Sequence, residues 1–342
     1  MHRSKIRHIP FAIVYSLLVS ACLAAAGARA DAQNSSSEQA PSPVALVDAL
    51  NGVFGKQTDG RAIHAKGIVL QGEFTPTRTA ASLSKAAHLN GKRILVTVRF
   101  SDFAGIPAIS DTDGLATPRG MAVRFALPGG TETDIVAHSI NGFPTKTAEQ
   151  FRELMIALGT SAGKTPPAPA DTFMAAHPIA KSFFDHLPPP PISYATVEYY
   201  GVNSFRFTNA KGQSRFGRYQ IVPAAGIQYL SKDDVAHADP NYLTTEVKQR
   251  VTTAPATFTL QVQLAEPGDV IDDPSIAWPD SRPVVKLGEI RVTRADEQSD
   301  ATQRQLMFSP AAVIDGIEPA DPMIGARNAA YAVSYQRRHS AQ

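Results

Sequence analysis

The feature that most constrains the fold is a series of short segments with the period-two alternation of half-buried strands. Ile94-Leu-Val-Thr-Val-Arg-Phe100 is the first of them, and Pro128-Gly-Gly130 and Asn209-Ala-Lys-Gly212 supply turn signals. We predict strands at residues 94–100, 121–127, 134–136, 194–200, 204–208, 216–222, 258–264 and 284–294. Apolar residues at helical spacing predict helices at 44–54, 148–158 and 174–187. Many antiparallel strands with helical excursions favour a closed barrel with helices packed outside it.

The first 30 residues have the three parts of a secretory signal peptide. Arg3, Lys5 and Arg7 form a basic start, residues 11–26 are almost wholly apolar, and Ala28-Arg-Ala30 fits a cleavage site. We therefore expect cleavage after Ala30 and a periplasmic or secreted protein. Two alternatives stay open. The apolar stretch could be retained as an anchor, although it is short for a membrane span, or Cys22 could be lipidated and tether the protein to a membrane.

The remaining chain predicts one domain after a short lead-in. Residues 31–43 are polar and rich in serine and proline, so we expect residues 31–58 to form a flexible spacer and a short helix. Residues 59–342 are then the main domain. Beyond residue 30, 29 lysines and arginines face 31 acidic residues, and this balance gives no reason to expect nucleic-acid binding. Cys22 is the only cysteine, which excludes disulfides and thiol peroxidase chemistry from a cleaved chain.

Two motifs from opposite ends of the chain contain residues suited to catalysis. In Arg327-Asn-Ala-Ala-Tyr331, an arginine precedes a tyrosine by one helical turn, so both side chains share one face of a helix. A guanidinium in that position favours the ionised phenol, which otherwise forms near pH 10. Arg61-Ala-Ile-His64-Ala-Lys-Gly67 offers a histidine that can act as both acid and base.

Together with further blocks in the same order, these motifs resemble the catalase family over residues 61–338. The blocks are Val98-Arg-Phe-Ser101, Pro118-Arg-Gly120, Gly201-Val-Asn-Ser-Phe-Arg-Phe207, Asn209-Ala-Lys-Gly212, Asp239-Pro240, Ala277-Trp-Pro279, 283–294, Phe308-Ser-Pro310, Gly316-Ile-Glu-Pro319 and Asp321-Pro-Met323. The resemblance implies an α+β fold, a catalase-type antiparallel β-barrel with surrounding helices. Because only 11 residues follow Tyr331, we expect the C-terminal helical and nucleotide-binding domain of large catalases to be lacking.

The resemblance also implies a cofactor, haem b, and a role for each matching residue. Tyr331 corresponds to the iron ligand, a role that tyrosine fills in catalases, and Arg327 to its charge partner. His64 corresponds to the general acid and base, Ser101 to the group that fixes its tautomer, and Asn141 to the group that positions the peroxide. The family's other haem contacts fall on Arg61, Arg99, Phe151, Tyr335 and Arg338. The segment Ser139-Ile-Asn-Gly-Phe-Pro144 departs from the family pattern by an insertion.

A short exported chain of this kind resembles the small catalase-related peroxidases. We therefore expect a haem peroxidase that reduces hydrogen peroxide or organic hydroperoxides with an organic electron donor, as a monomer or small homo-oligomer. A true catalase that disproportionates hydrogen peroxide is the first alternative. A haem-binding protein or a hydroperoxide isomerase is the second, although a haem carrier does not require His64, Ser101 and Asn141 together.

Overall fold

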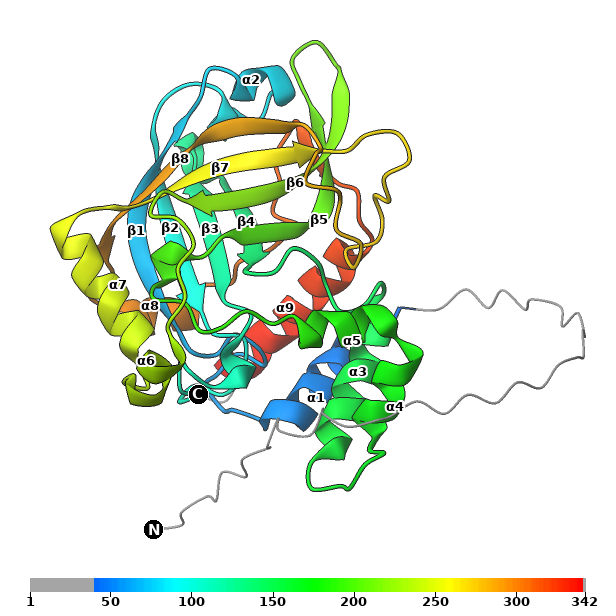
Figure 1. Ribbon diagram of the computed structural model, residues 1–342. Helices are drawn as coiled ribbons and strands as arrows, with labels where there is room; N and C mark the ends of the chain where they lie inside the picture. The colour runs from blue at the N-terminus through cyan, green and yellow to red at the C-terminus, as the bar shows by residue number, and fades with distance from the viewer. Residues whose placement is uncertain (1–39, 341–342) are drawn as a thin grey trace, which may run out of the picture.

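The computed structural model describes residues 40–340, and these form a closed antiparallel barrel with helices packed outside it (Figure 1). Neighbouring strands in the sheet follow the order β4-β3-β2-β1-β8-β7-β6-β5-β9, and pairing of His138 with Tyr200 joins β4 to β5 and closes the barrel. The strands are β1 (Gly67–Pro76), β2 (Ile94–Ser101), β3 (Gly120–Ala126), β4 (Glu132–His138), β5 (Tyr199–Thr208), β6 (Ser214–Pro223), β7 (Ala256–Leu264), β8 (Val284–Ala295) and β9 (Ile317–Pro319).

Alternate side chains of these strands fill the barrel interior. Large aromatic residues dominate it: Phe74, Phe100, Phe125, Phe207 and Phe258 are all fully buried. Burial of this apolar area is the main favourable contribution to folding, and it leaves the interior packed. Any functional cavity must therefore lie outside the barrel.

A helical layer covers the outer face of the barrel near the carboxyl end of β2 (Figure 1). It contains α1 (Pro43–Phe54), α3 (Ala148–Ser161), α4 (Pro169–Ala176), α5 (Pro178–Asp185) and the long C-terminal helix α9 (Met323–His339). Helices α1 and α3 pack closely together, and α9 crosses the face of the barrel to meet both. The remaining helices are α2 (Ala80–Leu83), α6 (Lys232–His237), α7 (Tyr242–Thr253) and α8 (Ser299–Gln305). In residues 40–340, no helix is long and apolar enough to cross a bilayer.

The structure corrects several predicted elements. The helix predicted at 174–187 is broken at His177, because Pro178 has no backbone N–H and begins a new helix, α5. Strands predicted at 194–200 and 204–208 are one strand, β5, preceded by a 3-10 turn at Tyr194–Thr196. Strand β1 and helix α7 were not predicted. The predicted signal peptide and most of the predicted spacer lie outside the described residues.

Candidate active site

A cavity lies between the outer face of β2, β3 and β4 and the helices α1, α3, α5 and α9. Two cross-strand rows form the barrel side of its wall: Arg99, Ala122 and Val136 in one, and Ser101, Gly120 and His138 in the next. Side chains of directly paired residues point to the same face of a sheet. The cavity has a volume of about 190 Å³.

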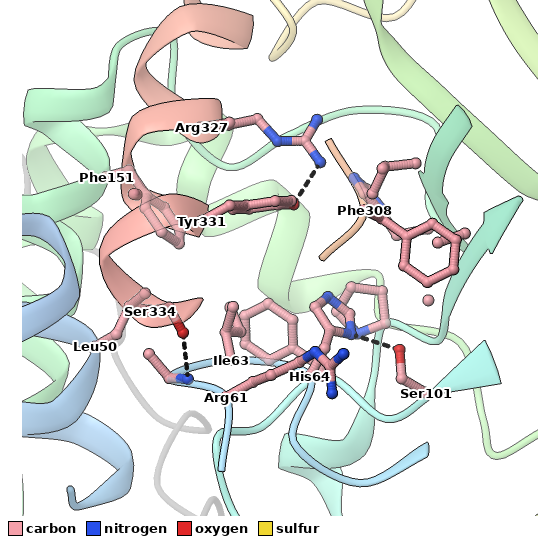
Figure 2. Close-up of a pocket in the computed structure, with 18 of the residues that line it drawn as sticks. Leu50, Arg61, Ile63, His64, Ser101, Phe151, Phe308, Arg327, Tyr331 and Ser334 are labelled. Atoms are coloured by element: carbon pink, nitrogen blue, oxygen red, sulfur yellow. Dashed lines mark hydrogen bonds between the residues drawn. The ribbon is translucent and has the colours of Figure 1, made fainter. Parts of the chain in front are cut away.

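Tyr331 and Arg327 project from α9 into this cavity (Figure 2). The Arg327 Nη2 donates a hydrogen bond to the Tyr331 phenol oxygen over 2.9 Å, as their spacing of one helical turn predicts. Arg327 is itself held from behind, because its Nη1 donates to the amide oxygen of Asn203. The Asn203 amide in turn donates to the Asp321 carboxylate over 2.7 Å. The chain of contacts fixes the guanidinium beside the phenol oxygen.

His64 lies on the opposite side of the cavity from Tyr331 (Figure 2). Its φ of +56° is the only positive value among non-glycine residues of the described chain. That conformation is held by a 2.7 Å hydrogen bond from the His64 amide to the Phe103 carbonyl. A costly backbone conformation kept by its surroundings is typical of functional sites. The His64 Nδ1 lies 3.1 Å from the Ser101 hydroxyl, which fixes the ring orientation.

The environment of His64 keeps its imidazole neutral. Burial, together with the nearby Arg99 and His138, lowers the pKa of His64 to about 3. A neutral imidazole has one donor and one acceptor nitrogen. With Nδ1 paired to Ser101, the other nitrogen remains available to take up and return a proton.

Three arginines at one end of the cavity have no acidic partner in the part of the chain that the structure describes. Arg61 donates to the carbonyl oxygens of Gln303 and Leu306 at 2.7 and 2.8 Å. Arg338 donates to the same Leu306 oxygen at 2.6 Å. Arg99 donates to the Gln303 side chain at 3.0 Å. None of the three forms an ion pair within residues 40–340. Burial lowers the pKa of Arg61, and it lowers those of Arg99 and Arg338 to about 10. Buried cations without partners favour an anionic ligand at this end.

These features together fit an iron porphyrin. A tyrosine phenolate is a known haem ligand in proteins, and the arginine cluster suits carboxylate side chains on a ring edge. The walls between them are apolar, and Phe151, Phe143 and Phe308 contribute aromatic surface. Gly120 also has a specific role, since a Cβ there would lie 2.5 Å from the Ser101 hydroxyl and 2.9 Å from His64 Nδ1. The glycine makes room for the histidine.

A buried ionic cluster supports this wall from behind. The Lys66 ammonium lies 2.5 Å from the Asp111 carboxylate, and the Arg119 guanidinium lies 2.5 Å from Asp102. The Tyr194 hydroxyl also donates to Asp102 at 3.0 Å. Asp102 directly follows Ser101, so these pairs fix the loop that leaves β2 beside His64. Their contribution is positional, because the desolvation of buried charges offsets most of their attraction.

Two residues predicted for the site do not line the cavity. Asn141 lies in the bend after β4 and is not part of the wall, which the chain rejoins at Phe143. Tyr335 is not part of the lining, and its ring contacts the Arg338 guanidinium, 4.5 Å from the ring centre, and the His339 ring. The remaining predicted residues all line the cavity: Arg61, His64, Arg99, Ser101, Phe151, Arg327, Tyr331 and Arg338.

Sequence reasoning also missed residues of the site. His138 lines the cavity, but a lone histidine at the end of a strand has no distinguishing motif. Asn203 and Asp321 were within the blocks that carry the family resemblance, yet nothing in their spacing indicated a contact with Arg327. Gln303 receives hydrogen bonds from two of the three arginines, and it lies in the unpredicted helix α8.

Comparison with known proteins agrees with this geometry. The catalase family model matches residues 31–342. A catalase-related peroxidase of Mycolicibacterium paratuberculosis is 38% identical over 300 residues, which are 86% of this chain and 94% of that protein. A catalase-related peroxidase of Synechococcus elongatus is 32% identical over 301 residues, covering 86% and 88%.

A solved fungal catalase has the same fold, with a TM-score of 0.74 at 21% identity. That match covers 86% of this chain and 62% of the fungal chain. The expected barrel with surrounding helices is therefore confirmed by both the strand topology and the structural match. Proteins of the matched family bind haem, in keeping with the phenol, the imidazole and the unpaired arginines around the cavity. The chain belongs to the catalase family.

Proposed function

We propose that the protein is a haem b peroxidase that reduces hydrogen peroxide or organic hydroperoxides with an organic electron donor. The observation that carries the proposal is the arrangement across one cavity of an arginine-bonded phenol and a buried neutral imidazole. The names of the two most similar relatives reported above, both catalase-related peroxidases, support the same reaction class.

The residues that would hold haem b divide into two groups. Tyr331 would be the iron ligand as a phenolate, and Arg327 would stabilise its charge through the 2.9 Å hydrogen bond. Arg61, Arg99 and Arg338 would bind the two propionates and so compensate the buried positive charge. When bound, haem supplies the redox-active iron at which the peroxide O–O bond is cleaved.

His64 would move the proton that cleavage requires. Its free nitrogen takes the proton from one peroxide oxygen and returns it to the other, which leaves as water or an alcohol. The overall reaction is ROOH + AH2 → ROH + H2O + A, where the donor AH2 supplies two electrons and two protons. The pKa of about 3 keeps the imidazole in its basic form at all ordinary pH values.

The cavity wall suits organic substrates. Helix α5 contributes Phe183 and Phe184, which are only half-buried and yet line the cavity, so the apolar wall reaches the surface there. Leu46, Leu50 and Met155 continue the apolar wall inward. Such a lining favours contact with hydroperoxides or donors that have apolar groups.

Steady-state assays of the haem-loaded protein test the proposal. We expect oxidation of guaiacol that depends on hydrogen peroxide or cumene hydroperoxide, and little oxygen evolution without a donor. The His64→Ala variant should retain haem but lose turnover by about 100- to 10,000-fold. His237→Ala, an exposed histidine of α6, is the matched control and should behave as wild type. Rapid oxygen evolution with no oxidation of guaiacol would instead identify a catalase.

We also propose that the protein is exported to the periplasm or secreted after cleavage behind Ala30. The basic start, the apolar stretch and the Ala28-Arg-Ala30 site support this proposal. Amino-terminal sequencing of the protein from fractionated cells should yield Asp31 from the extracytoplasmic fraction. Recovery of an uncleaved or Cys22-lipidated chain from membranes would contradict it.

A further inference from the structure

His64 lies over the cross-strand row formed by Ser101, Gly120 and His138. Gly120 pairs with Ser101 on one side and with His138 on the other, so the side chains of Ser101 and His138 point to the cavity face of the sheet. The His64 ring occupies the space above Gly120, as the 2.9 Å approach of Nδ1 to a Cβ there indicates. His64 therefore has Ser101 on one side and His138 on the other.

Both ring nitrogens of His138, Nδ1 and Nε2, are buried and have no hydrogen-bond partner among the described residues. Within residues 40–340, the close aromatic neighbour of His138 is Phe143, at 6.4 Å between ring centres. Unpaired polar atoms in a buried position are costly, and at an active site they are typically satisfied by the ligand. A half-turn of the ring about Cβ–Cγ exchanges the positions of nitrogens and carbons, so the imidazole can present either edge to the cavity.

The local backbone fixes His138 in this place. The Ser139 amide donates to the Arg119 carbonyl over 2.9 Å, and the Ser139 hydroxyl accepts from the Arg119 amide over 2.9 Å. Strand β4 thus ends at His138 in register with Gly120. The bend that follows needs Gly142 at a φ of +145°, and Asn141 is within it, outside the cavity wall. A polar side chain beside His64 is therefore supplied by the strand and not by the bend.

We propose that His138 is a second catalytic residue on the His64 side of the cavity, where its imidazole hydrogen-bonds and orients the peroxide, the role predicted from sequence for Asn141. The inference rests on the proposed peroxidase function. Like His64, His138 is neutral, because burial and the nearby Arg327 lower its pKa to about 3. A neutral imidazole can donate to one peroxide oxygen while His64 accepts from the other.

Fluoride binding to the haem-loaded protein tests this inference without turnover, because a bound fluoride ion accepts hydrogen bonds from nearby donors. His138→Leu and His138→Met remove the donor, and we expect the fluoride dissociation constant to rise roughly tenfold or more. The kcat/KM for hydrogen peroxide should fall by a similar factor. His138→Asn keeps an N–H donor and should remain within about threefold of wild type in both measurements.

His88→Leu is the matched control. His88 is also buried with an unpartnered Nδ1, but it contacts Phe74 and Phe125 in the barrel core and does not line the cavity. The fluoride affinity of His88→Leu should equal that of wild type. If His138→Leu and His138→Met retain haem and bind fluoride as tightly as wild type, the role of His138 is refuted while the proposed function stands. Wild-type protein that binds no haem would refute the proposed function itself.

Discussion

Replacing Gly120 with alanine should damage the active site far more than it damages the fold. A Cβ at this position would lie 2.5 Å from the Ser101 hydroxyl and 2.9 Å from His64 Nδ1, whereas ordinary contacts begin at 3.4 Å. The hydroxyl must therefore move by about 0.9 Å and the imidazole by about 0.5 Å, and their 3.1 Å hydrogen bond is lost or distorted. Both are side-chain atoms that can yield, so we expect a modest loss of about 1–3 kcal/mol in the free energy of unfolding.

Activity should respond more strongly, because displacement of a catalytic group by about 1 Å can cost roughly 100-fold. We expect kcat/KM for peroxide to fall about 10- to 100-fold in Gly120→Ala, with haem content unchanged. Gly114→Ala is the matched control, since a Cβ there meets nothing within 4 Å. Urea unfolding measures the stability change and donor-oxidation kinetics measure the activity.

A double variant identifies the cause. Ser101→Ala removes the hydroxyl that makes the closest contact, so Gly120→Ala should cost less in that background than in wild type. Losses that simply add, or a Gly120→Ala variant with wild-type kinetics, would show that His64 and Ser101 do not occupy the space above Gly120. The assigned geometry of the catalytic histidine would then be wrong.

Two further predictions concern charge. In Arg338→Leu, the Leu306 carbonyl keeps its 2.8 Å hydrogen bond from Arg61, so the unfolding free energy of the haem-free protein should change by less than about 1 kcal/mol. Haem affinity, measured by titration, should fall about tenfold or more. A haem affinity equal to that of wild type would show that Arg338 does not bind a haem propionate. Burial lowers the pKa of His88 to about 4, below the usual value of about 6.5. The stability that depends on a neutral His88 is therefore fully present above pH 6.5 and is lost as the pH falls towards 4. His88→Leu should therefore make the unfolding free energy, measured in urea, less steeply dependent on pH between 7 and 4.5, and an unchanged slope would contradict the assigned burial.

The sequence predicted most of the barrel because its half-buried strands alternate, and it missed β1 for a physical reason. Residues 68–70 of β1 are buried on both faces, since α8 covers the outer side and its Ser299 hydroxyl accepts a hydrogen bond from the Val69 amide. Burial on both faces removes the alternation that indicates a strand. The break at Pro178 was similarly hidden, because apolar spacing continues across it.

Local spacing predicted the contact between Arg327 and Tyr331, but not the residue beside His64. The contact follows from helical geometry alone, and the structure places the two groups 2.9 Å apart. The neighbour of His64 depends on the register of β2, β3 and β4, and no single segment records that register. Sequence similarity therefore pointed to Asn141, whereas strand pairing brings His138 to the cavity.

The most direct test of the account is the coordination of iron by Tyr331. Wild-type protein reconstituted with haem b should give visible and electron paramagnetic resonance spectra of ferric haem with an anionic oxygen ligand. Tyr331→Phe should lose those spectra or fail to retain haem, whereas Tyr335→Phe, whose ring does not line the cavity, should keep them. A spectrum of nitrogen-ligated haem in wild type, or one unchanged in Tyr331→Phe, would contradict the account.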